Sequence, residues 1–233
     1  MALLKISIII PTLNEASTIQ QVLQTVEAGK KHEQAIEVII VDAGSQDQTV
    51  ALAQQFGAKV LVSLPGRGQQ MNMGAQAATG DILLFLHADT RLPAGFATLV
   101  RQALEQPDVV AGAFDLQIDG QEWGLRWVEW GVKWRSRLLQ YPYGDQALFL
   151  MAKTFWQVGG FPKLPIMEDY EFVRQLKRSG RIAIVPTPVT TSKRRWHRLG
   201  IVRTTLINQW IVIAYRLGVA PEQLASWYRG IKK

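Results

Sequence analysis

IEVIIVDAGSQD, residues 36–47, contains the main clue to the architecture of this chain. The run Ile36–Val41 is rich in β-branched residues and ends at Asp42, where a polar loop begins. Such a run predicts a strand that is covered on both faces of its sheet. Three similar runs predict further strands at Ile6–Ile10, Lys59–Leu64 and Ile82–His87.

Helical stretches fill the gaps between these strands, at Glu15–Ala28, Asp47–Phe56 and Gln69–Ala78. Gly57 follows the second stretch as a C-terminal stop signal. Alternating strands and helices predict an open parallel α/β sheet, which binds ligands beyond the carboxyl ends of its strands. Four polar loops are expected at that edge: Pro11–Asn14, Asp42–Asp47, Pro65–Gln70 and His87–Thr90.

The regular alternation ends after Asp89. A helix is expected to begin at Pro93, followed by a strand at Val109–Ile118 with one solvated face. The segment Gln121–Gln140 predicts an amphipathic helix, because four tryptophans are spaced by four, three and four residues among basic side chains. The remaining predicted elements are a strand near Ala147–Ala152, a helix at Glu168–Arg178, a strand at Arg181–Val185, and helices near Val202–Leu217 and Glu222–Tyr228.

Composition narrows the classes of protein that fit. The 233 residues include 26 Lys and Arg against 19 Asp and Glu, a net charge of +7, with 48% hydrophobic residues and no cysteine. Such a chain can bury a full core, and it lacks disulfides, thiolate metal sites and a cysteine nucleophile. The charge fits a polyanionic partner, which leaves nucleic acid, an anionic lipid surface and a phosphorylated small molecule open.

The sequence predicts neither a membrane span nor a signal peptide. No run of 18 apolar residues occurs, and Pro11, Asn14 and Glu15 interrupt the apolar opening, which we interpret as a buried strand. Phosphate-binding loops are also absent, since Gly66-Arg67-Gly68 is followed by Met71 where a dinucleotide fingerprint needs a third glycine. What remains is a set of acids at predicted strand ends and loops, namely Asp42, Asp89, Glu168 and Asp169.

The segments ISIIIPTLNEA, EVIIVDAGSQDQT, TGDILLFLHADT, GGF and MEDYEF resemble, in order and spacing, the family 2 glycosyltransferases of the GT-A fold. The resemblance covers nearly the whole chain. The segments QMNMGAQAATGD, YGDQALF, MEDYEF and TSKRRW also resemble a small bacterial subgroup associated with arsenosugar biosynthesis. This implies a Rossmann-like, mostly parallel central sheet flanked by helices, with C-terminal amphipathic helices. The implied single domain, 1–233, comprises a nucleotide-sugar-binding half at 1–90, an acceptor and catalytic half at 91–192 and a helical extension at 193–233.

The resemblance further implies a metal-dependent, inverting transfer of sugar from a nucleotide diphosphate sugar to a hydroxyl acceptor. UDP is expected before GDP, and the product is expected in arsenosugar or in glycolipid and glycan biosynthesis. Mg²⁺ or Mn²⁺ is expected on Asp89, with His87 as a candidate second ligand where the family usually has the first acid of Asp-x-Asp. The implied donor-binding residues are Pro11, Thr12, Leu13, Glu15, Asp42, Arg67, His87, Ala88, Asp89 and Arg195.

Asp169 matches the general base of the family, which removes the proton of the acceptor hydroxyl and typically contributes about 10²–10⁴-fold to rate. Because Glu168 is its neighbour, the two carboxylates are expected to point in different directions. The expected acceptor-side residues are Asp145, Gln146, Glu168 and Trp196.

Structural interpretations stand beside these functional ones. Asp42 fits a cap of the helix expected to begin near Asp47, for which Ser45 is an equally good candidate. Asp89 fits a polar loop acid, and His87 fits a histidine bonded at a strand end. Glu168 and Asp169 also fit acids that complement a helix N-terminus, and Asp145 fits an ordinary turn. Arg67, Arg194 and Arg195 fit either phosphate contacts or a solvated basic face.

The tryptophans at 123, 127, 130 and 134 fit either the protein core or contact with anionic lipid. The expected location is the cytoplasm, with peripheral contact at the inner membrane face if this helix binds lipid. No nucleic-acid partner is expected. The alternatives to the transferase are a non-catalytic basic protein that binds nucleotide or lipid, and a nucleotidyltransferase. The latter usually needs a Gly-rich, Lys-bearing loop, which Pro11–Ala16 lacks.

Overall fold

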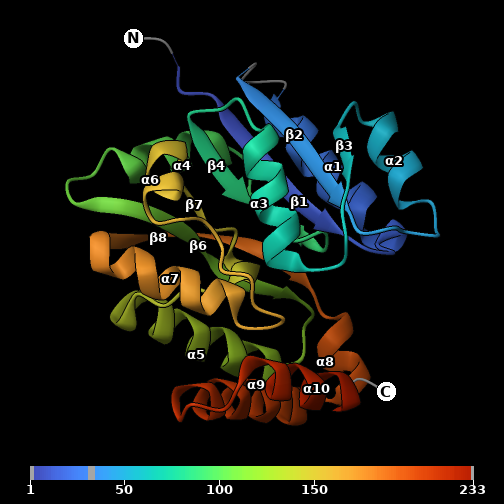
Figure 1. Ribbon diagram of the computed structural model, residues 1–233, viewed down its shortest axis with the longest axis vertical. Helices are drawn as coiled ribbons and strands as arrows, with labels where there is room; N and C mark the ends of the chain where they lie inside the picture. Colours follow the sequence, from blue (N-terminus) through green and yellow to red (C-terminus); the bar gives the residue numbers. More distant parts are fainter. Residues whose placement is uncertain (1–2, 31–34, 232–233) are drawn as a thin grey trace.

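The computed structural model describes residues 3–30 and 35–231. These residues form an α/β fold, in which helices flank a central sheet (Figure 1). The opening two residues and the last two of the predicted C-terminal extension lie outside the described residues. Within the described part of the chain the sheet has eight strands in the order β3-β2-β1-β4-β7-β6-β8-β5. The strands are β1 Ile6–Thr12, β2 Ile36–Asp42, β3 Lys59–Val62, β4 Ile82–Phe85, β5 Thr90–Arg91, β6 Val109–Asp119, β7 Phe149–Met151 and β8 Arg181–Ser192.

Helices pack on both faces of this sheet, and the last two helices pack on other helices at one end of the molecule (Figure 1). The helices are α1 Ala16–Lys30, α2 Thr49–Gln55, α3 Arg67–Ala77, α4 Phe96–Leu104, α5 Trp123–Leu139, α6 Ala152–Gln157, α7 Glu168–Ser179, α8 Arg194–Leu199, α9 Ile201–Arg216 and α10 Pro221–Ile231. Alternate residues of β1 explain the layers, because Ile8 packs in one core cluster with α1, α2 and α4 whereas Ile9 packs in another with α3, α6 and α7.

Most strand pairs are parallel, which confirms the expected fold class. β1 pairs in parallel with β2 and β4, β2 with β3, and β6 with β8. The antiparallel pairs are those of β7 with β4 and β6, and of β5 with β8. The parallel strands place the polar loops after β1, β2 and β4 at one edge of the sheet, as the sequence predicts.

Two predictions for the second half of the sheet are wrong. β6 has no long solvated face, since Ala111 and Ala113 enter one core cluster while Phe114 and Leu116 enter the other. β8 continues to Ser192 rather than ending at Val185, because Pro186 lies in a register shift where β6 moves from pairing with Val185 to pairing with Pro188. A bulge accommodates prolines there because they lack a ladder donor.

The predicted helices are present, with shifted ends and two additions. α4 begins at Phe96 rather than at Pro93, after Gly95 in the left-handed region with φ 69°. The short helices α6 and α8 and the two-residue strand β5 were not predicted. No helix among residues 3–30 and 35–231 is long and apolar enough to span a bilayer.

The core interpretation of the tryptophan stripe is wrong. Trp123, Trp127, Trp130 and Trp134 are 84%, 69%, 56% and 51% exposed. α5 packs on the sheet through its opposite side, where Leu125 is fully buried and Val128 and Val132 contact the core.

Candidate functional site

A cavity of about 670 Å³ lies at the carboxyl edge of the sheet, where α7, α8, α9 and α10 meet the loops after β1 and β4. Most predicted site residues line it. On the donor side these are Pro11, Glu15, Arg67, His87, Ala88, Asp89 and Arg195. On the acceptor side they are Asp145, Glu168, Asp169 and Trp196. The fold thus brings together residues from both halves of the chain.

The remaining donor-side residues do not line this cavity. Asp42 is 2% exposed, and its carboxylate accepts hydrogen bonds from Thr12 Oγ1 at 2.8 Å and from the backbone N–H groups of Gly44 and Ser45 at 2.9 and 2.7 Å. These bonds hold the loop after β2. The expected helix-capping role of Asp42 is wrong, because α2 begins only at Thr49 and has no side-chain cap. Leu13, the residue that follows β1, is exposed.

Gln146 is also not a cavity residue. Its side chain is fully buried; Nε2 donates to the Phe114 carbonyl at 2.8 Å, and Oε1 accepts from the Arg135 guanidinium at 3.1 Å. These bonds tie the 3₁₀ turn Gly144–Gln146 to β6 and α5. The expected acceptor-side role of Gln146 is therefore replaced by a structural one.

Asp89 lies in a loop that two strands fix. The Ser192 N–H donates to the Asp89 carbonyl at 3.0 Å, and β5 pairs with the end of β8. The carboxylate lies 3.5 Å from the Arg194 guanidinium, which also bonds Glu15 Oε2 at 2.6 Å. Burial raises the pKa of Asp89, Glu15 raises it further, and Arg194 opposes both effects.

His87 and Asp169 approach the same point. A β-carbon added to Gly144 would lie 2.9 Å from His87 Nε2 and 3.2 Å from Asp169 Oδ2, so only glycine leaves room for both groups. Burial, followed by the positive charges of Arg67 and Arg195, holds the pKa of His87 well below its ordinary value. The imidazole is therefore neutral at pH 7 and can donate at one nitrogen and accept at the other.

The two acids at the start of α7 point in different directions, as expected from their adjacency. Asp169 Oδ2 accepts from the Gly144 N–H at 2.9 Å, and Oδ1 accepts from the Tyr170 N–H at 2.7 Å. Glu168 pairs instead with Arg67 at 3.8 Å. Burial, and then the charge of Asp169, raises the pKa of Glu168. Glu168 thus lies beside a predicted donor residue rather than on the acceptor side alone.

Three buried polar atoms of the cavity lining have no hydrogen-bond partner in the described structure. They are Asp145 Oδ1, Arg195 Nε and Trp196 Nε1. Buried polar atoms are normally paired, so this group of orphaned atoms indicates a polar ligand. Burial also raises the pKa of Asp145. The positive charge of Arg135 lowers this pKa in part, and the negative charge of Asp169 raises it again.

Sequence reasoning missed the contribution of the C-terminal helices. Asn208, Ile211 and Val212 of α9 and Tyr228 of α10 line the cavity. Arg195 lies over the Tyr228 ring at 5.1 Å, and its Nη2 donates to Asn208 Oδ1. No local signal marks these residues, because only the packing of α9 and α10 on α7 brings them to the cavity.

Asp89 offers one carboxylate that could ligate a divalent cation. Within the described ranges no three His, Asp or Glu side chains converge as a ready-made metal site. Mg²⁺ commonly binds one or two carboxylates together with substrate phosphate oxygens, and Asp89 offers the protein part of such a set.

Residues 7–156 match the family described as glycosyl transferase family 2. The chain belongs to this family. Its relatives include glucosyl-3-phosphoglycerate synthase of Petrotoga mobilis, 32% identical over 132 residues, which are 50% of this chain and 41% of that protein. An uncharacterized glycosyltransferase of Mycobacterium tuberculosis is 30% identical over 141 residues, which are 57% of this chain and 62% of that protein. The chain thus matches less than two thirds of the length of either relative.

Solved structures share the fold of this chain. The mannosyltransferase PcManGT of Pyrobaculum calidifontis, in complex with GDP-Man and Mn²⁺, has a TM-score of 0.68 at 21% identity, over 99% of this chain and 70% of that one. The glucosyl-3-phosphoglycerate synthase of Mycobacterium tuberculosis, in complex with Mn²⁺, UDP and glucosyl-3-phosphoglycerate, has a TM-score of 0.60 at 20% identity, over 88% of this chain and 78% of that one. The GT-A fold of the family is therefore that of this chain.

Proposed function

We propose that this family 2 member transfers a sugar from a nucleotide diphosphate sugar to a hydroxyl acceptor, with inversion at the anomeric carbon. One observation carries the proposal. Asp89, from the loop after β4, and Asp169, from the start of α7, line one cavity together with Arg67 and Arg195. This arrangement combines an acid for the donor side, a base for the acceptor side and cations for a diphosphate.

On the donor side, Asp89 would hold Mg²⁺ or Mn²⁺, which supplies positive charge beside the diphosphate when bound. Arg67 and Arg195 are the proposed contacts for phosphate oxygens, since a guanidinium remains charged and presents paired donors. Asp89 and Glu15 share the Arg194 guanidinium, which keeps the two acids close without leaving them uncompensated. His87 is proposed to donate or accept a single hydrogen bond at the sugar or ribose.

On the acceptor side, Asp169 is the proposed general base. The N–H groups of Gly144 and Tyr170 fix its carboxylate, and each oxygen keeps a second lone pair that can accept a proton. The acceptor hydroxyl loses its proton to Asp169 as its oxygen bonds to the anomeric carbon. The bond between that carbon and the phosphate oxygen breaks, and the nucleotide diphosphate leaves with the bonding electron pair. Asp145, with an unpartnered buried oxygen, is the proposed contact for another acceptor hydroxyl.

The identity of the donor and the pathway belong to the same proposal. UDP is proposed before GDP, and the structures with the same fold include complexes with UDP and with GDP-Man. The proposed products are arsenosugars or glycolipids and other glycans, as the sequence motifs suggest. The exposed tryptophans of α5 also support peripheral contact with an anionic membrane at the cytoplasmic face.

A panel of nucleotide sugars tests the proposal, with nucleotide release measured in the presence and absence of an acceptor mixture. Release from one donor, stimulated by acceptor, is expected. Release from none of them, despite nucleotide binding, would support the non-catalytic alternative.

Asp89→Ala tests the donor side independently of turnover. Mn²⁺ together with UDP or GDP is expected to stabilise the native protein against heat, and this Mn²⁺-dependent gain should be absent in the variant. Asp119→Ala is the matched control, because Asp119 forms a surface ion pair with Arg91 outside the cavity. If calorimetry gave equal nucleotide affinity with Mn²⁺ and with EDTA, the metal role of Asp89 would be refuted.

A further inference from the structure

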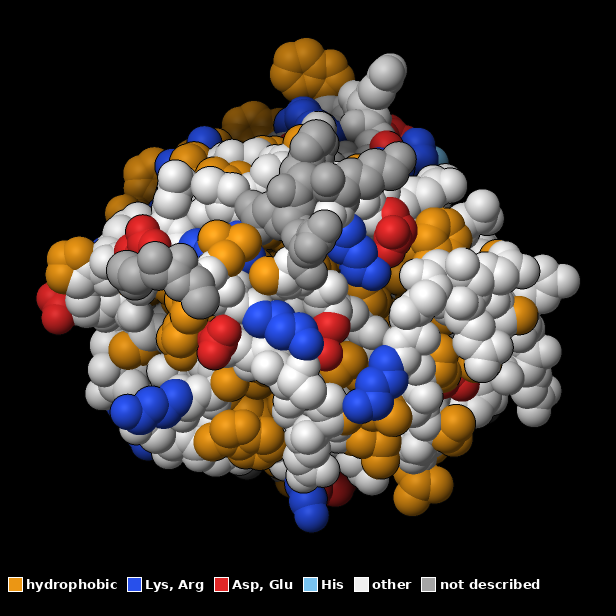
Figure 2. Space-filling model, turned by 90° about the horizontal axis from the view of Figure 1, so that it is seen from above, with side chains coloured by type: hydrophobic (Ala, Val, Ile, Leu, Met, Phe, Trp, Pro, Cys, Tyr) orange, Lys and Arg blue, Asp and Glu red, His pale blue; other side chains and the backbone are white. Residues whose placement is uncertain are grey.

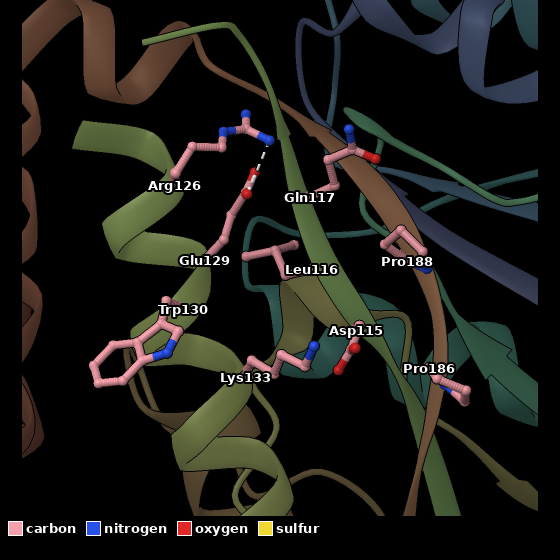
Figure 3. Close-up of a pocket in the computed structure, with 9 residues that line it drawn as sticks. All are labelled: Asp115, Leu116, Gln117, Arg126, Glu129, Trp130, Lys133, Pro186 and Pro188. Carbon is pink, nitrogen blue, oxygen red and sulfur yellow. Dashed lines mark ion pairs between the residues drawn. The ribbon is translucent and has the colours of Figure 1, made fainter. Parts of the chain in front are cut away.

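The tryptophan stripe of α5 is uncovered along its whole length. Its members recur every three or four residues, so they occupy a narrow band of the helix directly opposite the core contacts Leu125, Val128 and Val132. Figure 3 shows the same division, with Arg126 and Lys133 reaching toward β6 while the Trp130 indole turns away from the sheet. The four indoles therefore form an apolar surface with no covering element among the described residues.

A second apolar stripe lies on α9, which contacts α5 where Ile201 packs against Gly124. Both helices lie at the same end of the molecule, with α10 beside α9 (Figure 1). The exposed stripe of α9 consists of Val202, Leu206, Trp210, Ile213 and Leu217. Helical geometry places this stripe on a different side of α9 from Ile211 and Val212, which line the cavity. α9 is thus apolar on two sides, of which one borders the site and the other is exposed.

The positive charge of the chain is concentrated in the same elements. Residues 123–139 and 193–233 together contain 13 basic and two acidic side chains, whereas the rest of the chain contains 13 basic and 17 acidic ones. The view from above, away from α9 and α10, shows Lys and Arg beside Asp and Glu rather than a patch of one sign (Figure 2). The asymmetry favours a partner that is both apolar and anionic.

Of three basic side chains beside the stripe on α5, two form ion pairs with acids of the protein and one, among the described residues, does not. A hollow of about 420 Å³ between α5 and the sheet contains Arg126, paired with Glu129 at 2.9 Å, and Lys133, which has no ion-pair partner in the described structure (Figure 3). Arg137, on the same side of α5, is paired with Asp115 at 2.6 Å. Among the described residues Lys133 is therefore a basic side chain without an ion pair, on the flank of α5 between the band of indoles and the sheet.

We infer that the α5 and α9 stripes form one docking surface for a bilayer that contains anionic lipid. Indoles are suited to the boundary between headgroups and acyl chains, since they are apolar yet carry one N–H donor. The surrounding basic side chains add attraction to anionic headgroups. This inference deepens the membrane contact in the proposed function by assigning α9 to it. Since α9 also borders the cavity, docking would hold the acceptor side of the site next to the lipid.

Vesicle sedimentation at low ionic strength tests the inference. The protein is expected to bind vesicles of phosphatidylcholine and phosphatidylglycerol in equal parts, to bind vesicles of phosphatidylcholine alone much more weakly, and to be released by salt. The variants Trp127→Ser/Trp130→Ser and Leu206→Ser/Trp210→Ser should each weaken partitioning by on the order of tenfold or more, because each removes two exposed apolar side chains from the contact.

Trp156→Ser is the matched control, since Trp156 is 49% exposed on α6, at the other end of the molecule (Figure 1). It should bind vesicles like the native protein. Asp169→Asn should also bind normally, which separates a failure of this inference from a failure of the proposed transfer. Equal vesicle binding by all variants would overturn the inference. A second result would also overturn the inference: the native protein is a dimer that does not bind vesicles, and either stripe variant makes it a monomer. The surface would then join two copies of the chain.

Discussion

Replacing Asp169 by Asn tests the proposed base most directly. The change keeps the size of the side chain but removes its capacity to accept a proton. Turnover is expected to fall by about 10²–10⁴-fold. Since each factor of ten corresponds to about 1.4 kcal/mol, the loss is roughly 3–6 kcal/mol of transition-state stabilisation.

The contacts of Asp169 also predict a cost in stability. Its two oxygens accept from the N–H groups of Gly144 and Tyr170, at 2.9 and 2.7 Å. An Asn side chain has one acceptor oxygen, so one of these partly buried donors loses its partner, at a cost of about 1–3 kcal/mol. For a chain of this size each kcal/mol lowers Tm by roughly 2–4 °C.

Asp47→Asn separates the two effects. Asp47 accepts from the backbone N–H groups of Thr49 and Ala16, at 3.0 and 3.1 Å, but it does not line the cavity. Because Asp47 is exposed, water can replace the lost acceptor, so a smaller loss of stability with normal turnover is expected. Transfer would be measured well below both Tm values, with donor affinity measured separately by calorimetry. Near-native transfer by the Asp169 variant would refute the base assignment, and Glu168 or Asp145 would be tested next.

Two further predictions concern stability. Gln70→Leu should lower the free energy of unfolding by about 1–3 kcal/mol in denaturant titrations, because buried Gln70 Nε2 donates to the carbonyls of Thr12 and Val41 at 3.0 and 2.8 Å; an unchanged midpoint would contradict this. Asp145→Asn should raise Tm at pH 8, because burial raises the folded pKa of Asp145 and the native state therefore loses stability as pH rises through it. The gain should shrink as pH falls toward the unfolded pKa of about 4, and a gain independent of pH would oppose this explanation.

The first half of the fold could be predicted because burial leaves a direct mark on sequence. β1, β2 and β4 are covered on both sides, so they appear as mostly apolar runs between helical stretches. β8 could not be bounded in the same way, since Pro186 and Pro188 look like strand breakers unless a bulge accommodates them. The choice between core and surface for the α5 tryptophans was also undetermined, because helical spacing gives one face but not what covers it.

The site could be predicted residue by residue but not as an arrangement. Motif matches identified Asp89 and Asp169, yet nothing local indicates that Gly144 allows His87 and Asp169 to meet. The same limit applies to Asp42, whose position at a strand end predicts ligand contact while its actual bonds organise its own loop. The neighbouring loops decide which atoms of a motif face a ligand, and tertiary packing decides where those loops lie.

The pairing of β5 with β8 has a practical consequence for handling the protein. Thr90 Oγ1 and Thr191 Oγ1 bond at 3.1 Å, so the loop that carries Asp89 is fastened to the strand that leads into α8. Shortening the chain to the region of the family match, which ends at residue 156, would remove that strand and one wall of the cavity. A truncation that removes α10 would likewise open the site, because Tyr228 of that helix borders the cavity.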